Sequence, residues 1–288
     1  MGVTGDMVTL AFSTNAYTEH SLLEAAERIA GHGYDGVEIL GDEPHAYFPS
    51  LDPRETDRIA TVLADIGIGV ANVNANTAMG YYEDAPPTPF FEPSVIRADD
   101  SVRQWRIEYT KCAIDLAAAT AAPAISLTSG QPVPGTQPAE AERLLHESLR
   151  EILEYADQKG VDVGIEYEPD LLVGDTDDVL ELVEAVEHDR LGVNLDVGHA
   201  AVSGEDVPTA IRRAAGHITG VHLEDIVGGC GGTHYHRIPG EGDLDFRAIF
   251  DAFDDIGYDG YATLELYTYP DEPDRAAWES YEALVRYL

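Results

Sequence analysis

Four residues that could bind a metal ion lie at the ends of short apolar runs in the second half of this 288-residue chain. They are Glu166 in VDVGIE, Asp196 in LGVNLD, His222 in ITGVHL and Glu265 in YATLEL. A carboxylate among aliphatic residues is costly to bury unless it is paired or bound to a metal. Three carboxylates and one imidazole form a mixed oxygen and nitrogen site that suits Mn²⁺, Mg²⁺, Co²⁺ or Zn²⁺.

A second group of polar residues lies in the glycine-rich segment GGTHYHRIPGEGDLDF, which follows His222. His234, His236 and Arg237 are concentrated there, and a guanidinium can clamp a hydroxyl, carboxylate or phosphate oxygen. Surface loops also carry solvated histidines, so this segment alone does not establish a site. It is where substrate selection, or a second metal ion, would be sought.

The elements that must position these residues alternate between strand and helix patterns along the whole chain. Strand patterns cover residues 8–13, 36–40, 69–74, 124–128, 161–166, 191–196, 218–223 and 261–266. Helix patterns cover residues 21–33, 52–66, 101–120, 139–159, 176–187, 207–216, 246–256 and 274–288. Eight βα units without a linker-like break predict an α/β fold, a (β/α)8 TIM barrel that forms a single domain over residues 1–288.

In such a barrel the C-terminal ends of the strands open on one mouth, where we expect the four candidate ligands to meet. The first-half residues Glu38, His45, Asn74 and Asn76 could line the same mouth. An open doubly wound sheet is the alternative fold, but no GxGxxG motif opens the first βα turn.

The composition is strongly acidic, with 54 acidic and 17 basic residues and a net charge of −37. A disordered acidic chain would lack aromatic residues and periodic apolar runs, whereas this chain has 15 tyrosines. We therefore expect a folded, halophilic protein whose carboxylate-coated surface is suited to salt that screens self-repulsion. Such a surface also argues against nucleic acid as a partner.

The remaining composition points to a cytoplasmic protein without membrane association. No apolar run approaches the roughly 20 residues of a membrane span, and we recognise no secretion signal at the start of the sequence. The two cysteines, Cys112 and Cys230, match neither a disulfide framework nor a zinc-ribbon spacing.

Over nearly its whole length the chain resembles the xylose isomerase-like TIM-barrel superfamily, which includes sugar isomerases and epimerases, inosose dehydratases, hydroxypyruvate isomerases and endonuclease IV. The segments that carry the resemblance are IEYEP, NLDVGHA, VHLED, RIPGEGDLDF and LEL, in that order. The resemblance to the ketose 3-epimerase branch implies one divalent metal, Mn²⁺ before Mg²⁺, Co²⁺ or Zn²⁺. Its implied ligands are Glu166, Asp196, His222 and Glu265.

The same resemblance implies the roles of the surrounding residues. Glu166 and Glu265 would also act as acid and base on opposite faces of the substrate. His199 and Arg237 match the substrate-binding histidine and arginine of that branch. We expect His234, His236 and Glu168 to contact the substrate beside them.

The branches of the superfamily differ in the residues that they require. Endonuclease IV-like enzymes have extra histidines at the third and fourth strand ends, which here read GVANVNAN and AISLTSG. True xylose isomerases use two metals and a lysine, whereas Lys111 and Lys159 fall in helix patterns. These differences favour a metal-dependent sugar isomerase or epimerase that removes a proton next to a carbonyl and forms a cis-enediolate.

Other functions remain as alternatives. An inosose dehydratase-type lyase would begin with the same proton removal from a cyclic polyol ketone. An endonuclease IV-like AP-site nuclease and a non-catalytic metal-binding accessory subunit are more distant alternatives. The expected partner is a small sugar or polyol, and the sequence leaves open whether the chain forms a homo-oligomer.

Overall fold

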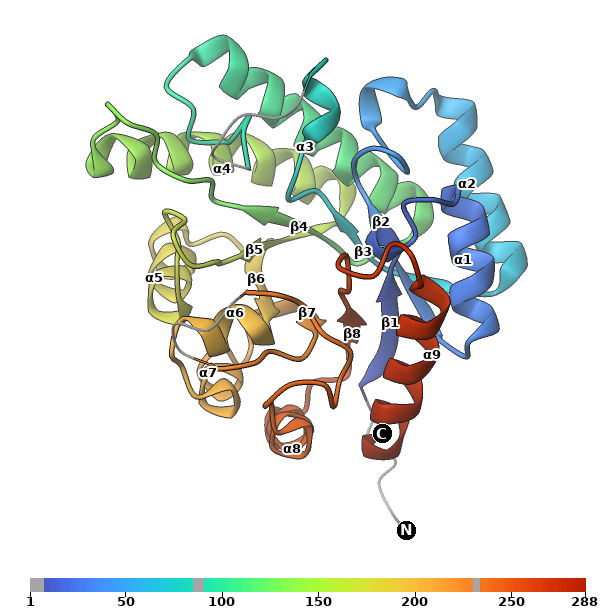
Figure 1. Cartoon of the computed structure of the whole chain (residues 1–288). Coiled ribbons are helices and arrows are strands. Elements are labelled where there is room, and N and C mark those ends of the chain that lie inside the picture. Colours follow the sequence, from blue (N-terminus) through green and yellow to red (C-terminus); the bar gives the residue numbers. More distant parts are fainter. Residues whose placement is uncertain (1–7, 85–90, 230–233) are drawn as a thin grey trace.

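The computed structural model describes residues 8–84, 91–229 and 234–288, and these form a closed parallel barrel surrounded by helices (Figure 1). The strands pair in sequence order, and the last closes on the first. They are β1 (Thr9–Ser13), β2 (Gly36–Leu40), β3 (Gly69–Asn74), β4 (Ala124–Thr128), β5 (Asp162–Glu166), β6 (Leu191–Asp196), β7 (Ile218–Leu223) and β8 (Tyr261–Leu264). The predicted (β/α)8 fold is therefore confirmed, and the open doubly wound sheet is excluded.

The helices follow the strands and cover the outside of the barrel. They are α1 (Leu22–Gly31), α2 (Pro53–Ile66), α3 (Asp100–Thr120), α4 (Pro138–Lys159), α5 (Thr176–Val186), α6 (Val197–Val202), α7 (Val207–Arg213), α8 (Phe246–Ile256) and α9 (Pro273–Leu284). Short 3-10 segments add to these: Thr14–Ala16, Phe48–Ser50, Met79–Tyr81 and Val285–Tyr287. In the part of the chain that the structure describes, no helix is both long and apolar enough to cross a membrane.

Local sequence accounts for where the helices begin and end. Ser21 forms a capping box with Glu24 at the start of α1, and the Asp52 carboxylate accepts two backbone N–H groups at the start of α2. These side chains satisfy amide groups that have no partner inside the helix. At the other end of α2, Gly67 adopts the left-handed conformation at φ 79°, which glycine adopts without steric cost.

Two elements differ from the sequence-based prediction in ways that affect the site. Strand β8 ends at Leu264, so Glu265 follows the strand instead of lying inside it. Helix α6 was not predicted, because the glycine and histidine of its short sequence VGHAAV give no apolar period. It begins directly after β6, where the Asp196 side chain accepts the backbone N–H of His199 at 2.8 Å.

The core has an apolar layer between strands and helices and a polar region inside the barrel. Val163, Ile165, Val193 and Leu195 are fully buried aliphatic residues of β5 and β6. The polar region inside the barrel includes carboxylates and amides of the strands that are also buried, among them Glu38, Asn74 and Glu166. As for the cysteines, Cys112 is exposed on α3, and Cys230 lies outside the described residues.

Candidate metal centre

The four predicted ligands converge at the C-terminal ends of the last four strands. Glu166 and Asp196 are the last residues of β5 and β6, His222 is the next-to-last residue of β7, and Glu265 directly follows β8. The register pairs Asp196 with His222 on neighbouring strands. All four side chains are buried, and each offers one ligand atom within 4.8 Å of the others.

The centre of this group is Nδ1 of His222. It lies 3.0 Å from Oε2 of Glu166, and 3.8 Å from both Oδ2 of Asp196 and Oε2 of Glu265. Among the described residues, no lysine or arginine pairs with these carboxylates, and Oδ2 of Asp196 is buried without a hydrogen-bond partner. Buried carboxylates with an unpartnered oxygen and one imidazole are the donor set of a divalent cation, so these residues fit a metal ion.

The charges of this group shift the pKa of its members. Burial alone would lower the pKa of His222, but the carboxylates of Glu166, Glu38 and Glu265 outweigh it and hold that pKa well above its usual value. Burial, reinforced by the neighbouring carboxylates, raises the pKa of Glu265 well above its usual value. Without a metal, the proton on His222 therefore supplies positive charge that a cation would otherwise supply.

Glu38 of β2 holds the other side of the His222 ring. Its Oε2 lies 2.7 Å from Nε2 of His222 and accepts a hydrogen bond from Nδ2 of Asn72 at 2.8 Å, while Oε1 accepts one from Nδ2 of Asn74 at 3.2 Å. Because an ionised carboxylate only accepts, Nε2 of His222 carries the hydrogen. In the neutral ring Nδ1 then keeps a lone pair, which a cation held by Glu166, Asp196 and Glu265 could accept. An outer carboxylate that orients a ligand histidine in this way is common at metal centres.

The metal-centre residues open on a cavity of about 540 Å³, within the range of small-molecule sites. Glu166 and Glu265 line it together with Asn15 and Asn74. Nδ2 of Asn15 and Nδ2 of Asn74 donate to Oε1 of Glu265 at 3.1 and 2.9 Å, and Nδ2 of Asn194 donates to Oε2 of Glu166 at 2.5 Å. Each glutamate is thus oriented by amides that add no charge.

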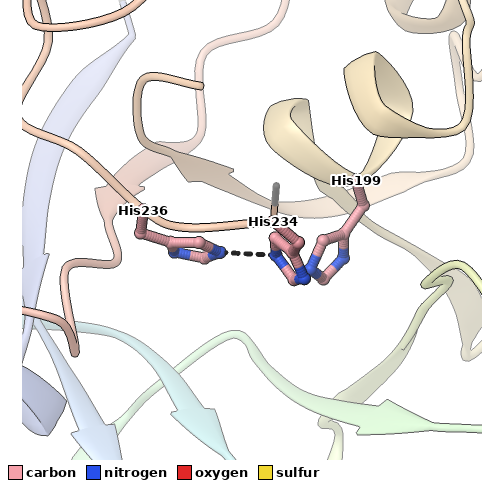
Figure 2. Close-up of side chains that lie close together, drawn as sticks. All are labelled: His199, His234 and His236. Carbon is pink, nitrogen blue, oxygen red and sulfur yellow. Dashed lines mark hydrogen bonds between the residues drawn. The ribbon is translucent and has the colours of Figure 1, made fainter. Parts of the chain in front are cut away.

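Three histidines form a second cluster on the same cavity (Figure 2). His199 comes from α6, and His234 and His236 come from the segment between β7 and α8. Nε2 of His234 lies 2.8 Å from Nε2 of His236, and the rings of His199 and His234 are 4.5 Å apart between centroids. Glu168 also lines the cavity, with Oε1 3.5 Å from Nδ1 of His234.

Five residues named from the sequence are not among those lining the cavity: Glu38, Asp196 and His222, which belong to the buried centre described above, and Arg237 and His45. The Arg237 guanidinium lies 6.0 Å from the centre of the Tyr235 ring, and its backbone pairs with Asp225. His45 hydrogen-bonds the Thr14 hydroxyl and two backbone carbonyl groups. Asn76, like Asn74, does line the cavity.

Glu224 is a buried carboxylate that the sequence did not single out. Within the described part of the chain, neither of its oxygens has a hydrogen-bond partner, and burial together with the charge of Asp196 raises its pKa well above the usual value. A Cβ at Gly198 would lie 2.0 Å from Oε1 of Glu224. Glycine is needed at position 198 because the Glu224 carboxylate approaches the backbone so closely.

The sequence and the fold of this chain are similar to those of known TIM-barrel proteins. A family model described as xylose isomerase-like TIM barrel matches residues 26–287. A fructoselysine 3-epimerase of Shigella flexneri is 30% identical over 275 residues, which cover 93% of each protein. A solved D-tagatose 3-epimerase-like protein has a TM-score of 0.79 at 23% identity, covering 97% of both chains. The IOLI protein, solved with a bound zinc atom, has a TM-score of 0.78 at 19% identity, covering 98% of this chain and 99% of the other.

Proposed function

Because the chain belongs to the xylose isomerase-like TIM barrel family, we propose that it is a divalent-metal-dependent sugar epimerase or isomerase. The observation that carries the proposal is the buried group of Glu166, Asp196, His222 and Glu265 beside a cavity of monosaccharide size. The 30% identity to a fructoselysine 3-epimerase supports a ketose or ketose-like substrate, and inversion at the carbon next to the carbonyl.

The four ligand residues would hold one divalent cation, for which we propose Mn²⁺ first and Mg²⁺, Co²⁺ or Zn²⁺ as alternatives. When bound, the cation polarises the substrate carbonyl and stabilises the negative charge that develops on its oxygen. The burial of these side chains excludes water, which strengthens every electrostatic interaction at this place.

Glu166 and Glu265 are the proposed acid and base. They come from β5 and β8, with β6 and β7 between them, and therefore face the cavity from different sides. One carboxylate removes the proton from the carbon next to the carbonyl, and the substrate becomes a cis-enediolate. The other returns a proton to the opposite face of the same carbon, which inverts it, or to the neighbouring carbon, which moves the carbonyl.

The remaining cavity residues would select the substrate. His199, His234, His236 and Glu168 line the cavity and offer hydrogen-bond partners for hydroxyl groups. Arg237 stays a prediction as a substrate-binding residue, since its guanidinium would have to leave the Tyr235 ring to reach the cavity.

The strand ends in the first half support sugar chemistry over nucleic-acid hydrolysis. Residues at the ends of β3 and β4 are Asn74, Asn76, Thr128 and Ser129, which offer amides and hydroxyls but no imidazole for further metal ions. The net charge of −37 also disfavours a phosphate backbone as a partner at low salt. A non-catalytic metal-binding subunit would have no use for two glutamates that face the cavity from different sides.

Substitution of each glutamate by its isosteric amide tests the proposal. We expect Glu166→Gln and Glu265→Gln each to lower kcat on the best ketose of a panel by at least about 10²-fold, the usual contribution of a positioned acid or base. Glu184→Gln is the matched control, because Glu184 is an exposed residue of α5. Metal content and thermal unfolding are measured on every variant, and full activity in both amide variants would refute the acid and base roles.

The panel also separates epimerase from dehydratase. It contains ketoses, fructosamines, hydroxypyruvate and an inosose, and products are followed by proton NMR. Inversion or carbonyl migration without loss of water supports the proposal. Loss of water from the inosose, with no turnover of the ketoses, would identify a dehydratase instead.

A further inference from the structure

We propose that Arg106 of α3 and Asp42 are positioning residues that hold one wall of the cavity in place for the proposed reaction. This wall is the segment of residues 74–80, which runs from the end of β3 into the 3-10 turn that follows it. Its residues that line the cavity are Asn74, Asn76, Thr77 and Met79. The inference rests on the proposed function, because the wall contacts Glu265, the proposed acid or base.

Arg106 binds the wall from the helix behind it. Its side chain is almost completely buried, on a helix that packs against β3 and β4. Nη1 donates to the carbonyl oxygen of Thr77 at 3.1 Å, and Nη2 donates to that of Asn76 at 3.1 Å. Nη2 also donates to the carbonyl oxygen of Ala75. A buried charge is costly, so an apolar side chain would serve packing alone better, whereas the rigid donors of a guanidinium hold three consecutive carbonyl groups at once.

Asp42 binds the same wall through its N–H groups. It follows β2 and is buried. Its Oδ1 accepts the backbone N–H of Gly80 at 3.0 Å, and its Oδ2 accepts that of Met79 at 2.6 Å. Oδ2 also accepts the hydroxyl hydrogen of Thr77 at 2.7 Å. A cation thus holds the carbonyl groups of the wall and an anion holds its N–H groups, an arrangement that we call the Arg106–Asp42 clamp.

A continuous chain of hydrogen bonds leads from the clamp to Glu265. The peptide group between Ala75 and Asn76 accepts a hydrogen bond from Arg106 at its oxygen. The same peptide group donates its N–H to Oδ1 of Asn74 at 3.2 Å, and Nδ2 of Asn74 donates to Oε1 of Glu265 at 2.9 Å. Hydrogen bonds in such a chain polarise and strengthen one another. Arg106 therefore fixes the amide that orients the Glu265 carboxylate, although it lies behind the wall.

The wall also presents an acceptor that no described residue uses. Oδ1 of Asn76 is buried and has no hydrogen-bond partner within residues 8–84, 91–229 and 234–288. Buried polar atoms are rarely left unpaired, and Asn76 lines the cavity. A substrate hydroxyl would satisfy this oxygen, so displacement of the wall should weaken substrate binding as well as misplace Glu265.

A double-mutant cycle between Arg106 and Asn74 tests whether Arg106 acts on the reaction through Asn74. Arg106→Met removes the guanidinium at similar length, and Asn74→Leu removes the amide at similar size. We expect each to lower kcat on the best ketose of the panel by about 10- to 100-fold, since a displacement of about 1 Å can have such an effect. The double variant should lose no more than about threefold beyond Asn74→Leu. Losses that multiply would overturn the inference, because they would mean that Arg106 acts on kcat by another route.

Further variants and a control accompany the cycle. It is measured on kcat at saturating substrate, so that weaker binding at Asn76 does not enter it. Arg106→Lys keeps the charge but not the fork of donors, and its kcat should lie between those of the wild type and Arg106→Met. Asp42→Asn is a second variant, which weakens the other half of the clamp. Arg143→Met is the control, because Arg143 is exposed on α4, and it should match the wild type. Circular dichroism and metal content are measured for every variant, and kcat refers to folded, metal-loaded protein.

Hydrogen exchange measured by mass spectrometry tests the clamp without any substrate. In Arg106→Met and Asp42→Asn, the N–H groups of residues 75–82 should exchange at least about tenfold faster than in the wild type, as expected when hydrogen bonds to a charged group are weakened. Those of β6 and β7 should exchange as before. Unchanged exchange at residues 75–82, or an equal increase in β6 and β7, would overturn the inference. A wild type that turns over no ketose, in variants that show the expected exchange, would refute the proposed function and leave the clamp intact.

Discussion

The contact between Glu38 and His222 provides a quantitative test of the metal centre. Glu38→Gln keeps the shape of the side chain but removes the charge that accepts the hydrogen of Nε2 at 2.7 Å. A hydrogen bond to a charged group contributes about 1.5–3 kcal/mol, and about 1.4 kcal/mol corresponds to tenfold in affinity. We therefore expect metal affinity to fall by about 10- to 100-fold, the range known for outer carboxylates at metal centres.

The assay is competition of the protein with a chelating dye for Mn²⁺ or Zn²⁺ at fixed pH. Glu184→Gln controls for the loss of one negative charge and should bind as the wild type does. Glu38→Asp keeps the charge but withdraws it by one methylene, so its affinity should lie between those of the wild type and Glu38→Gln. An affinity of Glu38→Gln within about twofold of the wild type would refute the idea that Glu38 sets the tautomer of His222.

Three further predictions follow from the structure. Because the pKa values of His222 and Glu265 are both raised, the metal-free centre holds protons that a bound cation displaces. Metal binding should therefore release at least one proton and strengthen as pH rises, measured by calorimetry in buffers of different ionisation enthalpy. The charged His222 ring stabilises the metal-free protein fully below about pH 6.5, and this stabilisation is lost as pH rises through the raised pKa. If the stability of the metal-free protein did not depend on pH above about 6.5, and no proton were released on metal binding, this assignment would be contradicted. Gly198→Ala should lower the free energy of unfolding by about 1–3 kcal/mol, because its Cβ would lie 2.0 Å from Oε1 of Glu224. Adding Glu224→Ala to the same chain should recover most of that free energy, as measured by chemical denaturation. Finally, if the charge of −37 reflects adaptation to salt, the thermal midpoint should rise steadily between low and molar KCl, and a midpoint that does not change would remove the halophilic hypothesis.

The barrel and the four converging residues could be predicted because their signals are local. Apolar strands alternate with capped helices, and a carboxylate or histidine at the end of a strand shows in a short stretch of sequence. The closure of parallel strands then brings distant residues together without any knowledge of side-chain contacts. The positions of these four residues could therefore be predicted, because the alternation of side chains along each strand and the parallel direction of the strands determine where their ends lie.

The role of Glu38 could not be derived in this way. Its strand, GVEIL, carries a single charge among aliphatics, which indicates a buried partner but not which one. The partner, His222, lies 184 residues further along the chain. Only the register of the closed barrel and the lengths of both side chains decide that the two meet.

The segment after β7 shows how adjacent residues can face different sides. His234 and His236 point to the cavity, while Tyr235 is exposed and the Arg237 guanidinium lies beside its ring. This is the alternation of an extended chain, in which residues two apart share a face and neighbours do not. A prediction that groups Arg237 with the histidines by proximity in sequence misses this alternation.

The central claim is that Glu166 and Glu265 transfer a proton to and from a carbon of a metal-bound sugar, and deuterium exchange tests it most directly. Protein loaded with Mn²⁺ is incubated in D₂O and high salt with the best ketose of the panel. The Mn²⁺ is exchanged for a diamagnetic metal before the NMR spectra are recorded. The account predicts deuterium at the carbon next to the carbonyl, lost on chelation and lost in Glu166→Gln and Glu265→Gln. Epimerisation without deuterium at that carbon, or exchange that persists in both variants, would contradict it.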